Sequence, residues 1–251
     1  MQPNLLILGG TTEATAFANA AAEAGLHGVV SFAGRVARPK RQPLPQRIGG
    51  FGGIAGLKAY LQAEKITHVI DATHPFAAQM SHNAVLACAE AAVPLIAFVR
   101  APWTAQTGDD WTHVRDIGGA VAALDQPAVR VMLAVGRMHL HDFAPNPQHF
   151  YLLRLVDPPE TAPPFPDHHV LFSRGPFTAA DDRALMREHR IDLVVSKNAG
   201  GGGAYAKVEA ARALGLPVIM IDRPALPPRT EAYRVAEVMD WIGHVGTERG
   251  V

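Results

Sequence analysis

Two glycines and two threonines near the start of the chain, Gly9, Gly10, Thr11 and Thr12, could form a phosphate-binding turn. Glycine has no Cβ to hold a ligand away from the backbone, and a threonine can cap the helix that follows. The first N–H groups of such a helix carry partial positive charge and suit an anion. The full G-x-G-x-x-G fingerprint is absent, so a tight turn without a ligand is the alternative interpretation.

The residues after the next apolar run indicate which dinucleotide this turn would bind. Residues 28–33 read as a second buried strand, and Ser31, Gly34 and Arg35 stand near its end. A nicotinamide-binding fold places its ribose discriminator there, and an NAD site uses a carboxylate. Because this chain presents a hydroxyl and a guanidinium, the sequence favours NADPH. The other basic residues between 38 and 47 could instead form a solvated loop.

Two more stretches of the N-terminal half are candidate ligand contacts. Gly50 and Phe51 lie in a glycine-rich run that would let the backbone approach a flat ligand or a phosphate, unless it is a flexible loop. Asp71, Thr73 and His74 follow a short apolar run, and ligands of open parallel sheets sit outside the carboxyl ends of the strands. The proline after His74 biases that residue towards an extended backbone.

Basic and hydroxyl residues also follow the apolar runs of the C-terminal half. They would meet at one edge of a sheet, and the main ones are Arg137, Ser173, Arg174, Ser196, Lys197 and Arg223. Guanidinium and ammonium groups beside glycine-rich turns fit an anionic ligand with several carboxylates or phosphates. Salt bridges on a loop-rich edge are the alternative interpretation.

The spacing of apolar runs and helical patterns predicts the elements that position these residues. Four buried strands are expected at 5–8, 28–33, 67–71 and 93–99. They alternate with helices, as in a doubly wound α/β domain. After linker-like residues 104–128, a second series follows at 131–135, 150–154, 169–172, 191–195 and 216–221. We therefore predict an α/β protein of two Rossmann-like domains, each with a mainly parallel sheet flanked by helices. The expected domains are residues 1–105, which bind the cofactor, and 106–251, which contribute to the substrate cleft.

Composition limits the partners and the compartment. The 251 residues include 23 basic and 23 acidic side chains, so the overall charge does not suggest nucleic acid or an anionic membrane as partner. A single cysteine excludes an internal disulfide, and no apolar run is long enough to span a membrane, so we expect a cytoplasmic protein. The 12 histidines show no metal-ligand spacing, and no metal is predicted. We expect a monomer.

Together these motifs resemble the precorrin-6A reductase family of corrin biosynthesis, over nearly the whole chain from Leu5 to about Pro224. The resemblance rests on residues 7–14, 33–35, 47–53, 71–77 with Ser81 and Asn83, and on Ser196 and Lys197 with Gly200 and Lys207. It implies two Rossmann-like halves, NADPH as hydride donor, and a tetrapyrrole macrocycle with acetate and propionate side chains in the cleft between the halves.

The resemblance and the residue chemistry together give an expected site. Cofactor-binding residues would be Gly9, Gly10, Thr11, Thr12, Ser31, Gly34, Arg35, Gly50, Phe51 and Thr73. Substrate-binding residues would be Asp71, His74, Ser81, Arg137, Arg174, Ser196, Lys197 and Lys207. His74 is the nominated proton donor, although bound water or a pyrrole nitrogen could serve instead.

Three other functions fit parts of the same pattern. Within the family, the substrate could be the cobalt-containing macrocycle of the oxygen-independent pathway. The glycine turns would also suit a transferase that uses a nucleotide-sugar, or a nucleotide-sensing protein without catalysis. A short-chain dehydrogenase is disfavoured because no Tyr-x-x-x-Lys motif is present.

Overall fold

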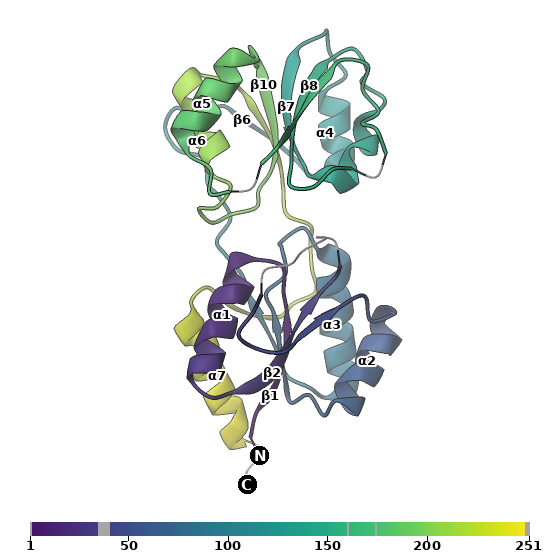
Figure 1. Ribbon diagram of the computed structural model, residues 1–251, viewed down its shortest axis with the longest axis vertical. Coiled ribbons are helices and arrows are strands. Elements are labelled where there is room, and N and C mark those ends of the chain that lie inside the picture. Colours follow the sequence, from purple (N-terminus) through teal and green to yellow (C-terminus); the bar gives the residue numbers. More distant parts are fainter. Residues whose placement is uncertain (1, 35–40, 160, 174, 249–251) are drawn as a thin grey trace. The chain divides into compact units, whose positions relative to one another are not determined.

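The computed structural model describes residues 2–34, 41–159, 161–173 and 175–248, and the chain divides into two compact units (Figure 1). The first unit is Met1–Arg100 with Ala225–Val251, and the second is Ala101–Pro224. The C-terminal segment therefore lies in a different unit from the one expected. It does so because its strand and helix extend the sheet and core of the first unit.

The first unit contains a six-stranded sheet in the order β12-β5-β4-β1-β2-β3, in which every pair is parallel. Its strands are β1 (Asn4–Leu8), β2 (His27–Phe32), β3 (Gln46–Ile48), β4 (His68–Asp71), β5 (Leu95–Phe98) and β12 (Thr230–Ala232). The helices are α1 (Thr12–Glu23), α2 (Gly53–Ala63), α3 (Ala78–Ala91) and α7 (Val235–Glu248). Helices α1 and α7 cover one face of the sheet, and α2 and α3 cover the other (Figure 1).

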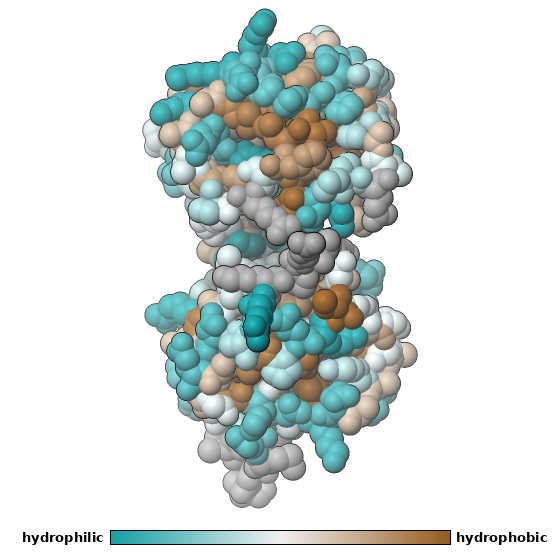
Figure 2. All heavy atoms as spheres, viewed as in Figure 1, coloured by the Kyte–Doolittle hydropathy of each residue, from teal (hydrophilic) through white to brown (hydrophobic). Residues whose placement is uncertain are grey.

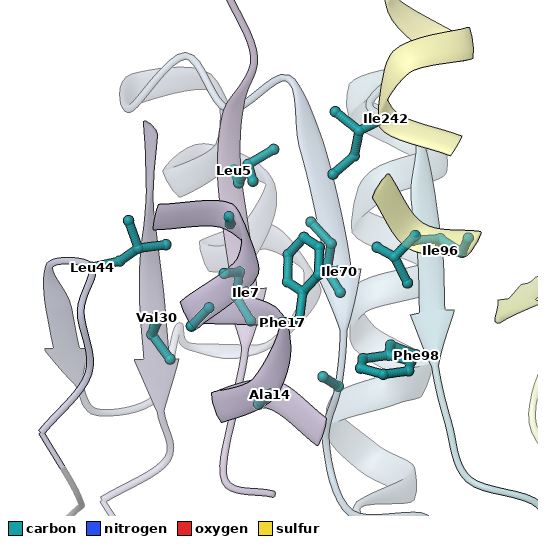
Figure 3. Packing of buried hydrophobic residues seen from close by; sticks show 14 of the residues in the cluster. Leu5, Ile7, Ala14, Phe17, Val30, Leu44, Ile70, Ile96, Phe98 and Ile242 are labelled. Atoms are coloured by element: carbon teal, nitrogen blue, oxygen red, sulfur yellow. The ribbon is translucent and has the colours of Figure 1, made fainter. Parts of the chain in front are cut away.

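Alternation along β1 builds the core on both faces of this sheet. Leu5 and Ile7 pack with Phe17 of α1 and Ile242 of α7, on the face drawn in Figure 3. Leu6 and Leu8 pack on the opposite face, against α2 and α3. A strand buried on both faces needs apolar residues at every position, which explains the uninterrupted run in the sequence.

The second unit repeats this architecture with a parallel sheet of six strands in the order β6-β11-β10-β7-β8-β9. Its strands are β6 (Trp111–Val114), β7 (Arg130–Ala134), β8 (Phe150–Leu155), β9 (His168–Phe172), β10 (Leu193–Lys197) and β11 (Val218–Ile221). The helices are α4 (Ile117–Ala123), α5 (Ala179–Glu188) and α6 (Ala206–Leu214), with two 3₁₀ turns, η1 (Arg137–His139) and η2 (His141–Phe143). These sheets confirm the predicted fold class.

Parallel strands bring their carboxyl ends to one edge of each sheet. In the first unit, the glycine turns and the Asp71 segment follow β1, β3 and β4 at that edge. In the second unit, the basic residues follow β7, β10 and β11. None of the helices in the described residues is long and apolar enough to cross a bilayer. On the face shown in Figure 2, apolar residues gather in patches bordered by hydrophilic residues.

Candidate functional site

The turn after β1 is held in place by bonds to two neighbouring strands. The Gly9 N–H donates to the Ser31 carbonyl (2.8 Å), and the Thr11 hydroxyl donates to the Ala72 carbonyl (2.7 Å). Thr11 also caps α1, because its hydroxyl oxygen accepts from the Ala14 N–H (3.1 Å). Gly10 has a φ of +118°, and a Cβ added there would meet nothing within 4 Å. The turn thus offers open space and a helix N-terminus, which suits a phosphate.

An arginine that the expected site did not include organises the ends of β2 and β3. Arg47 lies opposite Ser31 in the parallel register, and its guanidinium donates to the Ser31 hydroxyl (2.9 Å). It also donates to the Gly49 (3.0 Å) and Gly50 (3.2 Å) carbonyls and stacks 3.9 Å from the Phe51 ring centroid. One side chain therefore links three residues expected to bind the cofactor. Arg35 lies outside the described residues.

Asp71 is the centre of a buried network at the end of β4. One carboxylate oxygen accepts from the Thr73 hydroxyl (2.7 Å) and N–H (3.2 Å), and the other accepts from Arg229 Nη1 (2.8 Å). The Asp71 and Arg229 side chains are 1% and 8% exposed. The Thr73 hydroxyl also contacts the buried Ser81 hydroxyl at 3.2 Å. Because both Asp71 oxygens have partners within the protein, this geometry favours a supporting role for Asp71 over contact with a ligand.

His74 lies in the same loop, half-buried between the strand and α3. Its Nδ1 accepts from the Phe76 N–H at 3.2 Å, and the two rings are 5.9 Å apart. An imidazole nitrogen that accepts a hydrogen bond carries no proton, so the neutral ring of His74 carries its proton on Nε2. The loop thereby orients the neutral ring of His74.

In the second unit, two of the expected substrate-binding residues are buried. Ser196 is fully buried, and its hydroxyl donates to the Lys197 carbonyl at 3.2 Å. Lys207 donates from Nζ to the Ala204 carbonyl (2.6 Å) and lies 5.1 Å from the Trp103 ring centroid. Burial and, to a smaller extent, the nearby Arg154 guanidinium lower the pKa of Lys207 to about 8. Burial favours a supporting role for both residues.

The glycine-rich turn after β10 is fastened by residues near both ends of the second unit. Asn198 accepts from the Trp103 N–H (2.8 Å) and donates to the Trp103 carbonyl (2.9 Å). Arg223 donates to the Asn198 (3.1 Å) and Ala199 (3.2 Å) carbonyls. Gly200 has a φ of +70°, and a Cβ there would collide with Arg223 and the Ala101 carbonyl. Arg223 thus holds backbone in place, a role that its position in the sequence does not reveal.

Two further basic residues of the expected site, Lys197 and Arg137, stand at the carboxyl edge of this sheet. Lys197 ends β10 and is half-buried. Arg137 begins η1 and donates to the Pro158 carbonyl at 3.4 Å. Arg174 lies outside the described residues. Among the described residues, the expected cofactor residues thus lie in the first unit, and Arg137, Ser196, Lys197 and Lys207 lie in the second.

Comparisons with known proteins cover nearly the whole chain. A family model described as "Precorrin-6x reductase CbiJ/CobK" matches residues 4–243. The precorrin-6A reductase of Rhodobacter capsulatus is 60% identical, over 98% of this chain and 99% of its own. The cobalt-precorrin-6A reductase of Priestia megaterium is 31% identical, over 94% and 96%. A solved structure named "CobK precorrin-6A reductase" superposes with a TM-score of 0.93 at 59% identity, covering 98% of both chains.

Proposed function

The chain belongs to the precorrin-6x reductase family, and on that premise we propose that it reduces precorrin-6A to precorrin-6B in cobalamin biosynthesis, with NADPH as hydride donor. The observation that carries the proposal is the near-complete coverage at high identity to precorrin-6A reductases. The lower identity to cobalt-precorrin relatives supports a metal-free substrate.

The first unit has the features that a dinucleotide needs. The open space at Gly10 and the capped N-terminus of α1 would receive the pyrophosphate. At the end of β2, where an NAD enzyme places a carboxylate, this chain has Ser31 bonded to the Arg47 guanidinium. Positive charge there suits the 2′-phosphate of NADPH, and Arg35 would add to it.

NADPH, when bound, supplies the hydride, and the protein's own groups supply position and a proton. We assign His74 as proton donor in its imidazolium form, because it follows β4 at the carboxyl edge of the sheet, where open parallel sheets bind their ligands. Asp71, Thr73 and Arg229 hold that loop in one conformation. Arg137 and Lys197 would bind the acetate and propionate groups of the macrocycle, because both stand at the carboxyl edge of their sheet.

The test is a spectroscopic assay of the purified protein with precorrin-6A. Loss of nicotinamide absorbance and a changed macrocycle spectrum should occur together with NADPH, and more slowly with NADH at equal concentration. Cobalt-precorrin-6A serves as the competing substrate. Consumption of NADPH only with the cobalt-containing macrocycle would assign the protein to the oxygen-independent reaction. No turnover of either macrocycle would contradict the proposal.

A further inference from the structure

An ion pair that the expected site did not include lies at the start of α1, where the pyrophosphate of a dinucleotide would bind. Glu13 stands in the first turn of this helix, and its Oε1 lies 3.7 Å from Arg100 Nη1. The two side chains are 20% and 16% exposed, so water and salt screen the pair only in part. The other Glu13 oxygen, Oε2, accepts from the Thr12 hydroxyl at 3.1 Å. Both oxygens of this carboxylate therefore have partners within the first unit.

The backbone of the same turn shows why a carboxylate at this position matters. Thr11 caps α1 through the Ala14 N–H, and among the described residues the N–H groups of Thr12 and Glu13 have no acceptor. Such N–H groups at a helix N-terminus are the donors that bind a phosphate. Glu13 would therefore present its own N–H to the pyrophosphate while its side chain carries a negative charge. A carboxylate alone stabilises a helix N-terminus, whereas it repels a second anion that binds there.

Arg100 reaches this helix from two strands away. It follows β5, and β4 lies between β5 and β1 in the sheet. The strand order reverses between β1 and β4, and dinucleotides bind across such a switch point with the pyrophosphate at the N-terminus of the first helix. The Thr11 hydroxyl crosses the same point, because it donates to the Ala72 carbonyl after β4 at 2.7 Å. Arg100 thus places a positive charge beside the helix N-terminus from the β5 side of the sheet.

We propose that Arg100 is a positioning residue for the cofactor, which neutralises Glu13 and so lets the turn after β1 bind the pyrophosphate more tightly. The inference rests on the proposed function, because it assigns a role at the cofactor site of that function. It differs from the contacts proposed for Ser31, Arg47 and Arg35, which concern the 2′-phosphate. Because the pyrophosphate is common to NADPH and NADH, a change at Arg100 should affect both cofactors equally.

The test is a double-mutant cycle with Arg100→Met, Glu13→Gln and Glu13→Gln/Arg100→Met. Affinities for NADPH and NADH are measured by calorimetry in the absence of macrocycle. Arg100→Met leaves the Glu13 carboxylate without its cation, so both affinities should fall about tenfold, and the loss should shrink between about 0.1 M and 1 M NaCl. The double variant also removes the repelling charge, so its affinities should return to within about threefold of wild type. Glu13→Gln alone should not weaken binding.

Lys58→Met is the matched control for this cycle. It also removes the cation of an ion pair in the first unit, because Lys58 Nζ lies 3.1 Å from Glu90 Oε2, but that pair joins α2 to α3. Both cofactor affinities should be unchanged in this variant. The melting temperature should change little in Arg100→Met, because partly exposed ion pairs contribute little to stability.

Four results would overturn the proposal. Unchanged affinities in Arg100→Met would show that the pair does not influence the cofactor, and a loss for NADPH alone would place Arg100 at the 2′-phosphate. A double variant as weak as Arg100→Met would show that Arg100 does not act by compensating Glu13. An equal loss in Lys58→Met would show that the effect is not specific to this pair. If wild-type protein binds neither NADPH nor NADH, the proposed cofactor fails together with the inference, which distinguishes that case from the other four.

Discussion

Replacing Arg229 by methionine should destabilise the first unit selectively. In the native protein the Asp71 side chain is 1% exposed, and its carboxylate lies 2.8 Å from Arg229 Nη1. The substitution leaves this buried carboxylate without its charged partner. Breaking a buried ion pair costs about 3–5 kcal/mol, and the lower value applies because the two bonds from Thr73 to Asp71 remain. A loss of about 3 kcal/mol corresponds to a fall of roughly 11 °C in the melting temperature of a unit of this size, because the entropy of unfolding is about 2.1 cal/mol/K per residue.

The chain contains its own reporters for this experiment. Trp241 is the one tryptophan of the first unit, and Trp103 and Trp111 lie in the second. Thermal melts followed by ¹⁹F NMR of 5-fluorotryptophan-labelled protein therefore report the two units separately. We expect the Trp241 resonance to lose its native shift at the lower temperature, with the other two unchanged.

A second substitution tests whether the cost comes from the unpaired charge. In Asp71→Asn/Arg229→Met the carboxylate is gone, so at least half of the lost stability should return. Arg229→Lys keeps the charge without the planar donor geometry and should be intermediate. A loss below about 1 kcal/mol in Arg229→Met, or an equal loss in both units, would refute the role given to this pair.

Three further predictions follow from the site. Gly10→Val should abolish NADPH binding in calorimetry, because the new side chain fills the open space at the turn and a β-branched residue opposes the φ of +118°, at a local cost of about 1–3 kcal/mol that leaves the rest of the fold intact; normal binding would place the phosphates elsewhere. Lys207→Met should remove a rise in the stability of the second unit between about pH 8 and 10, a window in which the unfolded lysine binds more protons than the native one; an unchanged slope in urea titrations would contradict this. His74→Asn keeps an acceptor near the Phe76 N–H but cannot take up and release a proton, so kcat should fall about a hundredfold with little change in KM; an unchanged kcat would remove His74 as proton donor.

The fold class could be predicted because most strands of a doubly covered parallel sheet are unbroken apolar runs. The strands that the sequence did not indicate, β3, β6 and β12, are all outer strands. Their sequences, Gln46–Ile48, Trp111–Val114 and Thr230–Ala232, are short or partly polar. An outer strand is bonded on one side only and faces solvent, so it needs no such apolar run.

The local sequence does not indicate which of the two sheets the C-terminal segment joins. The segment after Pro224 pairs β12 with β5 through backbone bonds, and residues of α7 enter the core beside α1. Nothing in the local pattern distinguishes this from continuation of the second domain. A single domain boundary in the sequence therefore cannot describe the first unit, which is built from two separate segments of the chain.

Separation along the sequence also limits prediction of the site. The turn at Gly9 and Gly10 was recognisable because strand, turn and helix are consecutive. Arg229 could not be assigned, since 158 residues separate it from Asp71. Arg47 lay within a recognised motif, and pairing β3 with β2 in register would have placed it opposite Ser31. To assign Arg47 and Arg229 to the site, the position of each residue in the sheet is needed in addition to its type.

The most direct measurement of the central claim uses NADPH deuterated at C4 of the nicotinamide. The protein is incubated with precorrin-6A and each of the two C4 epimers in turn, and the product is analysed by mass spectrometry. A site that fixes the nicotinamide against one carbon of the macrocycle predicts a single deuterium in the product from one epimer and none from the other. Product without deuterium from either epimer, or with equal label from both, would contradict hydride transfer in an ordered site.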